Sequence, residues 1–329
     1  MFILEQKIIA GVDVGGTSIK AALFTMEGKM IRKKTATTLV GAEAGSVIAQ
    51  MRDLVEALLA KTGIPNSKLL GIGAGIPGPV DPAAGIVLEA VNLGWKQTML
   101  VDILEQQVNV PVYAENDANL AALGEMWLGA GRGAKDLVAL TLGTGIGCGI
   151  ILNGQIVGGA SGGGGEIGHM TMETKGGPVC SCGRTGCLET FASATAIIRE
   201  AERAARAGSS KILAATLATQ GKLTAKDVFA AASAHDESAI AVIDRASYYL
   251  GLACSHLAVL LNPARIVFGG GVSQAGPELF DRVRHYFSRF APAYAICDIL
   301  PAALGNDAGI IGGAWLVRSR LYGMGAPGC

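Results

Sequence analysis

The first forty residues alternate between apolar runs and short turns. Residues 7–14 form an apolar run, which predicts a buried strand. Gly15-Gly16-Thr17 is typical of a tight turn, so residues 18–25 are expected to return as a second strand. A turn at Glu27-Gly28-Lys29 then leads into a third strand over 30–37. The chain therefore opens with three consecutive strands.

The rest of the chain mixes helical periodicity with shorter apolar runs. Further strands are expected at 69–75, 110–114, 136–142, 146–152 and 265–268, with a loop between Gly75 and Asp81. Helices are expected at about 43–62, 98–108, 116–130, 191–206, 224–234, 236–261, 276–290 and 306–322. The strands on either side of Gly143-Thr144-Gly145 repeat the opening pattern, which predicts a duplicated α/β core.

The length of 329 residues is sufficient for two domains of ordinary size. Because no low-complexity linker separates the halves, we expect a tight hinge near Glu115 and again near Asn306. The predicted first domain comprises residues 1–115 and 306–329, and the second comprises residues 116–305.

Composition excludes several classes of partner. Lys and Arg number 27, as do Asp and Glu, so neither nucleic acid nor an anionic membrane is an expected partner. No apolar stretch is long enough to span a bilayer, and the first sixteen residues lack the features of a secretory signal. The cysteines are odd in number and partly clustered, which fits a reducing compartment, so a cytoplasmic location is expected.

A cysteine cluster follows a histidine in the second half of the chain. His169, Cys180, Cys182 and Cys187 form the pattern H-x₁₀-C-x-C-x₄-C. Three thiolates and one imidazole complete a tetrahedral zinc set with no position left for water, so the predicted zinc is structural. Scattered reduced cysteines near a histidine are the alternative. Two carboxylates, Glu166 and Glu189, frame the segment, and the loop over 166–190 is therefore expected to shape a site.

Two glycine turns are candidates for binding phosphate. In Asp13-Val14-Gly15-Gly16-Thr17, glycines let backbone N–H groups approach an anion, and Thr17 adds a hydroxyl. Asp13 is placed to hold a hydrated Mg²⁺ against phosphates. One such turn alone is equally well a plain hairpin, but Gly143-Thr144-Gly145 supplies a second one in the other half. Gly269-Gly270-Gly271, after a strand, would let an adenine ring lie close to the backbone.

Two other nucleotide-binding motifs are excluded. Residues 73–78 match G-x-G-x-x-G, but Pro79 follows, so no helix begins there as a dinucleotide-binding turn requires. The chain also lacks the phosphate-binding pattern G-x-x-x-x-G-K-[ST].

A set of polar residues indicates a ligand with many hydroxyl groups. Asn116 and Asp117 lie between a short strand and a helix, where either could simply cap the helix. Alternatively, Asp117 is a general base. Together with Glu166, His169 and Glu189, these residues offer the acceptors that suit a sugar.

The motifs, taken in order, resemble those of the ROK family of repressors and sugar kinases. They are D-V-G-G-T-S-I-K, G-x-P-G-P-V-D, E-N-D-A-N, L-G-T-G-I-G, G-E-I-G-H, C-x-C-G-x-x-G-C-L-E-T and G-G-G-V. The resemblance covers nearly the whole chain, and its zinc motif is the most specific part. It is strongest to the bacterial glucokinases of the family, and it implies two actin-like α/β domains, of the ribonuclease H-like and hexokinase type, around a deep cleft.

The resemblance implies a role for each matching position. Asp117 would take the proton from the 6-hydroxyl of glucose. Asn116, Glu166, His169 and Glu189 would hold the ring hydroxyls, with His169 binding zinc through its other nitrogen. Mg²⁺ and the phosphates of ATP would be held by Asp13, Gly15, Gly16, Thr17, Lys20, Gly143, Thr144 and Gly145. Two positions depart from the family pattern, Cys148 and Ser161.

Several alternatives remain at this point. The substrate could be another hexose or N-acetylhexosamine, such as N-acetylglucosamine, N-acetylmannosamine, mannose or fructose. A sugar-sensing repressor is a remote alternative, because such proteins carry a DNA-binding domain before the first glycine turn and Asp13 lies near the start of this chain. The resemblance also implies a homodimer or a dimer of dimers. Use of polyphosphate in place of ATP is left open.

Overall fold

The computed structural model describes residues 6–323, and its contacts divide the chain into two compact units. The first unit takes residues 1–135, 149–164 and 304–329, and the second takes 136–148 and 165–303. The ends of the predicted first domain, 1–5 and 324–329, lie outside the described residues.

This division differs from the predicted boundaries at 115 and 306. Residues 116–135 join the first unit because α3 (Asp117–Leu128) packs along α10 (Ala308–Tyr322). Residues 149–164 also join the first unit, although the sequence pattern continues the preceding strand without a break. Packing partners that are distant in sequence therefore set the boundaries, and the local pattern does not reveal them.

A five-stranded sheet forms the centre of the first unit. Its order is β3-β2-β1-β4-β8, in which β1 to β3 pair antiparallel and β4 and β8 continue in parallel. The strands are β1 (Ile8–Val14), β2 (Ser18–Thr25), β3 (Met30–Thr37), β4 (Leu69–Ile76) and β8 (Val112–Asn116). The three strands predicted at the start of the chain are confirmed.

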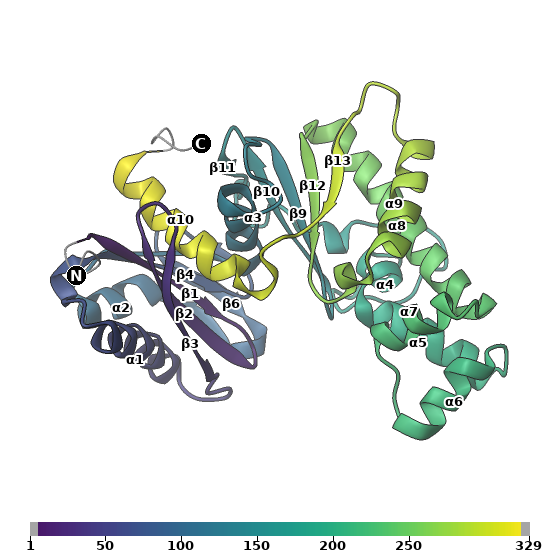
Figure 1. Ribbon diagram of the computed structural model, residues 1–329, viewed down its shortest axis with the longest axis horizontal. Helices are drawn as coiled ribbons and strands as arrows, with labels where there is room; N and C mark the ends of the chain where they lie inside the picture. Colours follow the sequence, from purple (N-terminus) through teal and green to yellow (C-terminus); the bar gives the residue numbers. More distant parts are fainter. Residues whose placement is uncertain (1–5, 324–329) are drawn as a thin grey trace. The chain divides into compact units, whose positions relative to one another are not determined.

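Helices cover both faces of this sheet. Helix α1 (Ala44–Thr62) packs on β2 and β3, while α10 runs along β1 and β4 on the other side (Figure 1). Seven apolar side chains of α1 are buried, in agreement with its predicted amphipathic pattern. The helix ends at Gly63, whose positive φ of 68° provides a left-handed C-cap.

A small antiparallel sheet in the first unit was not predicted. It consists of β5 (Val80–Asp81), β6 (Ile86–Ala90) and β7 (Trp95–Thr98), and α2 (Leu100–Val108) follows it. The loop predicted between Gly75 and Asp81 is therefore wrong at both ends, because β4 extends to Ile76 and β5 begins at Val80. These strands are short and interrupted by turns, so their side-chain alternation is too brief to recognise.

The second sheet has the order β11-β10-β9-β12-β13. Its strands are β9 (Leu137–Leu142), β10 (Ile146–Leu152), β11 (Gln155–Ile156), β12 (Arg265–Gly269) and β13 (Asp298–Pro301). Strand β12 lies parallel to both β9 and β13. The edge strands β11 and β13 were missed, because two to four residues carry little periodic signal.

Helices make up most of the second unit. They are α4 (Glu189–Ala192), α5 (Ala194–Arg206), α6 (Lys211–Gln220), α7 (Ala225–Ser233), α8 (Glu237–Leu261) and α9 (Pro277–Phe290). Short 3₁₀ turns occur in both units at η2 (Asn66–Lys68), η3 (Val91–Leu93), η4 (Ile167–His169), η5 (Val272–Ala275) and η6 (Gly305–Asp307). The predicted helix over 191–206 is divided at Ser193, which caps α5 by accepting from Ala196 N–H. The sequence prediction missed α6.

The two mixed sheets with flanking helices confirm the predicted α/β class. In the described part of the chain, no helix combines the length and the apolar character needed to cross a membrane.

Candidate active site

The first glycine turn joins β1 to β2 and is held by backbone bonds. Gly15 N–H donates to Ser18 O at 2.9 Å, and the Thr38 hydroxyl donates to Gly15 O at 2.7 Å. Thr38 N–H in turn donates to Thr17 O at 3.1 Å. The turn is thus fixed from outside by Thr38, a residue that sequence reasoning did not select.

Asp13 is the second-last residue of β1 and lies beside this turn, next to the start of α10. A Cβ added to Gly309 would lie 2.9 Å from Asp13 Cγ, so a larger residue there would displace the carboxylate. Burial raises the pKa of the Asp13 carboxyl, and the nearby Lys20 ammonium counteracts part of that shift. Lys20 Nζ lies 3.8 Å from Asp13 Oδ2 and donates to Asn306 O at 3.0 Å. A carboxylate at the end of a strand is therefore paired with a single cation.

Asn116 and Asp117 lie where β8 passes into α3. The structure assigns the capping role to Asn116, whose side-chain oxygen accepts from Ala118 N–H at 2.9 Å and Asn119 N–H at 3.2 Å. Its amide also donates to Gly78 O at 3.0 Å, which leaves one amide hydrogen for a ligand. Asp117 Oδ1 accepts from Ala118 N–H at 2.8 Å.

Strand pairing brings the first-unit carboxylates together. Asp13 pairs with Gly75 in β4, and the neighbouring Ile76 pairs with Asn116 in β8. A Cβ added to Gly75 would lie 3.5 Å from Asp13 Oδ1 and 3.7 Å from Asp117 Cα. The glycine keeps this space clear, so the predicted magnesium carboxylate and the predicted base share one edge of the sheet.

The predicted zinc ligands form one cluster in the second unit. The ligand atoms of His169, Cys180, Cys182 and Cys187 all lie within 4.8 Å of one another. Cys182 Sγ lies 3.7 Å from Cys187 Sγ, and Cys180 Sγ lies 3.4 Å from His169 Nδ1. Zinc–sulfur bonds of about 2.3 Å in a tetrahedron require sulfurs about 3.8 Å apart, so the cluster fits zinc.

The loop backbone supports this cluster. Isolated antiparallel β-bridges pair Thr171 with Cys187 and Val179 with Thr185, and they bring the two ends of the segment together. Hydrogen bonds from Arg184 lower the pKa of the Cys182 thiol to about 6, whereas burial raises the pKa of the Cys180 and Cys187 thiols.

Glu189 connects the cysteine cluster to the second glycine turn. Its Oε1 accepts from the Ser181 hydroxyl at 3.1 Å and lies 4.0 Å from His169 Nδ1. A Cβ added to Gly145 would lie 2.7 Å from Glu189 Oε2, so the carboxylate lies directly against that turn. A side chain predicted to hold the sugar therefore also adjoins a phosphate-binding candidate.

The second turn is held by the helix that follows the zinc loop. Ala194 N–H donates to Gly143 O at 2.9 Å, and the Thr195 hydroxyl donates to Thr144 O at 2.8 Å. Thr195 was not selected from the sequence, although it lies in the S-A-T segment directly after the cysteine motif.

The third glycine turn lies beside the second. Gly269 pairs with Thr141 in β9, and a Cβ on Gly270 would overlap the carbonyl of Leu142. Gly270 has a φ of 84°, which glycine adopts without strain, while a Cβ on Gly271 would meet no atom within 4 Å. Residues 143–145 and 269–271 thus form one glycine-rich strip at the carboxyl ends of adjacent strands.

The candidate residues divide between the two units. Asp13, Gly15, Gly16, Thr17, Lys20, Asn116 and Asp117 belong to the first unit, while Glu166, His169, Glu189 and the glycines of the later turns belong to the second. Glu166 is exposed and immediately precedes η4. Each unit therefore carries one phosphate-binding candidate and part of the predicted sugar site.

Comparison with known proteins gives a consistent match. The sequence model that represents the ROK family matches residues 9–320 of this chain. A glucokinase from Halalkalibacterium halodurans is 46% identical over 323 residues, which cover 98% of each chain. A xylose repressor from Caldicellulosiruptor bescii is 31% identical over 281 residues, covering 85% of this chain and 70% of the repressor.

A solved structure of similar fold contains glucose and AMPPNP. It is the ROK family glucokinase from Streptomyces griseus in complex with glucose and AMPPNP. That protein is 33% identical, the match covers 95% of this chain and 99% of the other, and the TM-score is 0.79.

Proposed function

This chain belongs to the ROK family, and we propose that it is a glucokinase that transfers the γ-phosphoryl group of ATP to the 6-hydroxyl of D-glucose. The products are ADP and glucose 6-phosphate. The observation that carries the proposal is that Asp13 and Asp117 lie on either side of Gly75 at the same end of the first sheet, together with a glycine turn in each unit. The glucokinase relatives, similar along nearly their whole length, support the same reaction.

Asp117 is the proposed general base. A sugar hydroxyl attacks a phosphorus centre readily only when its proton can move to an acceptor. Asn116 holds the strand-to-helix junction through its cap, so the adjacent carboxylate is fixed on the backbone. The proposed partners of the ring hydroxyls are Asn116, Glu166, His169 and Glu189. An amide can donate to a hydroxyl or accept from it, and a carboxylate accepts from it.

The glycine turns are the proposed binding sites for the phosphates. Backbone N–H groups of the Gly15–Thr17 and Gly143–Gly145 turns would approach the phosphate oxygens, and the strip at 269–271 would accept the adenine. Asp13 is the proposed ligand for hydrated Mg²⁺, which would neutralise charge on the transferring group. Lys20 already pairs with Asp13, and it would move its ammonium toward the phosphates as the metal takes that carboxylate.

The zinc site is proposed to be structural. Its four protein ligands leave no open position, so the ion would organise the loop and hold His169 by Nδ1. The other ring nitrogen, Nε2, is then available to the sugar, with its tautomer fixed by the metal.

Three parts of the proposal extend beyond the reaction itself. Glucose is the preferred substrate, and initial rates over glucose, mannose, fructose, N-acetylglucosamine and N-acetylmannosamine would test that preference. A reducing location such as the cytoplasm is proposed because thiolates must stay reduced to hold zinc. A homodimer or dimer of dimers stays a prediction, which sedimentation measurements would decide.

The general base is tested by replacing Asp117 with Asn. Asp117→Asn keeps size and most hydrogen bonding but cannot take a proton, so turnover should fall by roughly 10²–10⁴-fold. Glucose binding should stay close to normal, because the lost interaction forms in the transition state. Turnover by coupled assay and glucose binding by calorimetry measure the two effects.

Asp102 offers a matched control. It is an exposed aspartate in the first turn of α2, as Asp117 is in α3, so Asp102→Asn tests the general effect of removing charge at a helix start. It should leave turnover unchanged. Near-normal turnover in Asp117→Asn would contradict the proposed mechanism.

A further inference from the structure

A cavity lies within the first unit. Its volume is about 370 Å³, and its walls come from β5, the end of β8, the β10–β11 hairpin and the second half of α10. Among the described residues, its lining includes none of the proposed zinc ligands, phosphate-binding glycines or sugar ligands. Glu115 is the lining residue nearest in sequence to the catalytic segment, because it directly precedes Asn116.

The cavity holds two opposite charges. Glu115 is only 7% exposed, and its Oε1 accepts from Asn116 N–H and from the Asn119 amide, both at 2.9 Å. Burial raises the pKa of this carboxyl, and the positive charge of Arg320 counteracts part of the shift. The exposed Arg320 guanidinium also lies over the Tyr113 ring, 5.9 Å from its centre. The cavity lining therefore carries the buried carboxyl group of Glu115 and the exposed guanidinium of Arg320.

Other lining groups add hydrogen-bonding capacity. Trp315 is 2% exposed, and its indole N–H has no hydrogen-bond partner among residues 6–323. This N–H is buried beneath the cavity surface, so the Trp315 ring contributes an apolar part of the lining. Gln155 on β11 and the Ser319 hydroxyl on α10 also line the cavity, as do apolar side chains such as Leu123.

This combination selects one class of ligand. An apolar molecule would cover Glu115 and Arg320 without offering either one a polar group, and a neutral sugar would leave Arg320 without an anion. A nucleoside triphosphate brings far more negative charge than one guanidinium can match. A sugar phosphate supplies hydroxyl donors for Glu115, acceptors for the Gln155 amide, and an anion for Arg320. We propose that this cavity is a second, noncatalytic binding site for a hexose phosphate.

The position of the cavity gives such binding a consequence. Hydroxyl groups on Glu115 would compete with the bonds from Asn116 N–H and Asn119, which hold the junction that carries Asp117. An occupant there would slow turnover without occupying the glucose site. That the occupant is the enzyme's own product, glucose 6-phosphate, rests on the proposed function.

Binding is tested with the catalytic site filled. Wild-type protein would be saturated with glucose and a nonhydrolysable ATP analogue, and glucose 6-phosphate binding measured by calorimetry and by tryptophan fluorescence. We expect one site per chain. Arg320→Gln should weaken binding by about tenfold or more, since bonds to charged groups contribute about 1.5–3 kcal/mol.

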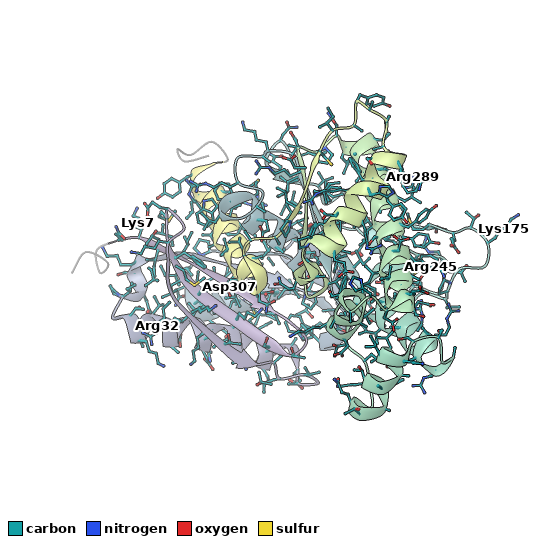
Figure 2. All side chains as sticks on the ribbon, turned by 45° about the vertical axis from the view of Figure 1, so that its right-hand side comes forward. Lys7, Arg32, Lys175, Arg245, Arg289 and Asp307 are labelled. Atoms are coloured by element: carbon teal, nitrogen blue, oxygen red, sulfur yellow. The ribbon has the colours of Figure 1, made fainter. Side chains whose placement is uncertain are left out.

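Two further variants strengthen the test. Gln155→Ala is an independent change in the lining and should also weaken binding. Arg32→Gln removes another exposed arginine of the first unit, on β3 and not in the cavity lining, and should leave binding unchanged (Figure 2). Glucose KM and initial turnover without product should be the same in all three variants as in wild type.

The possible outcomes separate the two proposals. Failure of glucose 6-phosphate to bind the saturated enzyme, or equal binding by Arg320→Gln, would overturn the second site. Equally tight binding of inorganic phosphate would overturn the role of the sugar. Purely competitive inhibition against glucose would contradict the separate location. A failure of the proposed glucokinase function would instead appear as no phosphorylation of glucose in the initial-rate assay, whatever the binding result.

Discussion

At the scale of single residues, the site depends on side chains that serve two neighbours. Asn116 caps α3 and keeps one amide hydrogen for a ligand, so the two roles weighed from its sequence position are compatible. Glu189 contacts Ser181 in the zinc loop and lies against Gly145 in the second glycine turn. Sequence spacing identified both residues as candidates, but the second contact of each depends on the fold.

Glu189→Gln tests the sugar contact. The amide keeps the shape but weakens charge-assisted hydrogen bonds, so the KM for glucose should rise by roughly tenfold. The KM for ATP should change little, because the Gly143–Gly145 turn is held mainly by its own backbone and by Thr195. Steady-state kinetics with each substrate varied would measure both constants.

A matched change elsewhere tests whether the effect is local. Glu237 is an exposed glutamate in the first turn of α8, as Glu189 is in α4, and Glu237→Gln should have normal kinetics. A glucose KM that stays at the wild-type value in Glu189→Gln would show that this carboxylate does not bind the sugar.

At the scale of elements, the first unit depends on close packing of α10 against the sheet backbone. A Cβ on Gly11 of β1 would overlap the carbonyl of Ile310, and one on Gly73 of β4 would overlap that of Gly313. The glycines therefore let a helix lie directly on two strands. This contact positions the start of α10, where Gly309 adjoins Asp13 and Asp307 pairs with Lys33 (Figure 2).

Gly11→Ala should reduce the stability of the protein. The methyl group has no space against backbone atoms, and overpacking of this kind costs about 1–3 kcal/mol or more. Gly45→Ala is the control, because Gly45 lies within α1 and an added Cβ there would meet nothing within 4 Å. The control should be neutral or stabilising by about 0.5–1 kcal/mol. Denaturant unfolding of both variants decides the prediction, and equal stability would contradict it.

These elements also show how much of the fold can be predicted from the sequence. The pattern of residues 7–37 predicts three strands because buried residues and turn glycines follow one another regularly. Gly11 lies inside such a strand, yet nothing local indicates that its partner is a helix about 300 residues later. Strands β5 to β7 and β13 are too short for periodicity, and β13 pairs with a strand about thirty residues earlier in the chain. The zinc ligands were predictable because one short loop carries all four.

At the scale of the whole molecule, the first unit contains the whole first sheet and also β11 and the end of β10 from the second sheet, while the candidate zinc cluster belongs to the second unit. The chain also gathers the base and the predicted magnesium ligand in the first unit. The predicted zinc site and the predicted catalytic carboxylates therefore belong to different compact units. Loss of zinc should affect one part first.

Removal of zinc is expected to loosen residues 166–192 and leave the first sheet protected. Residues 171–179 and 181–185 are exposed or only partly buried, so the metal would supply much of the stability of this loop, and local opening without it needs little free energy. Strands β1 and β2, in contrast, are almost fully buried. Hydrogen exchange before and after treatment with a chelator would measure both regions, with metal analysis to count the zinc.

Cys182→Ser should reproduce the effect, whereas Cys297→Ser, which changes a cysteine outside the cluster, should not. Added zinc should restore protection in the wild type but not in Cys182→Ser. Equal loss of protection in the loop and in the first sheet, or a fully protected loop without metal, would show that zinc does not stabilise the loop locally.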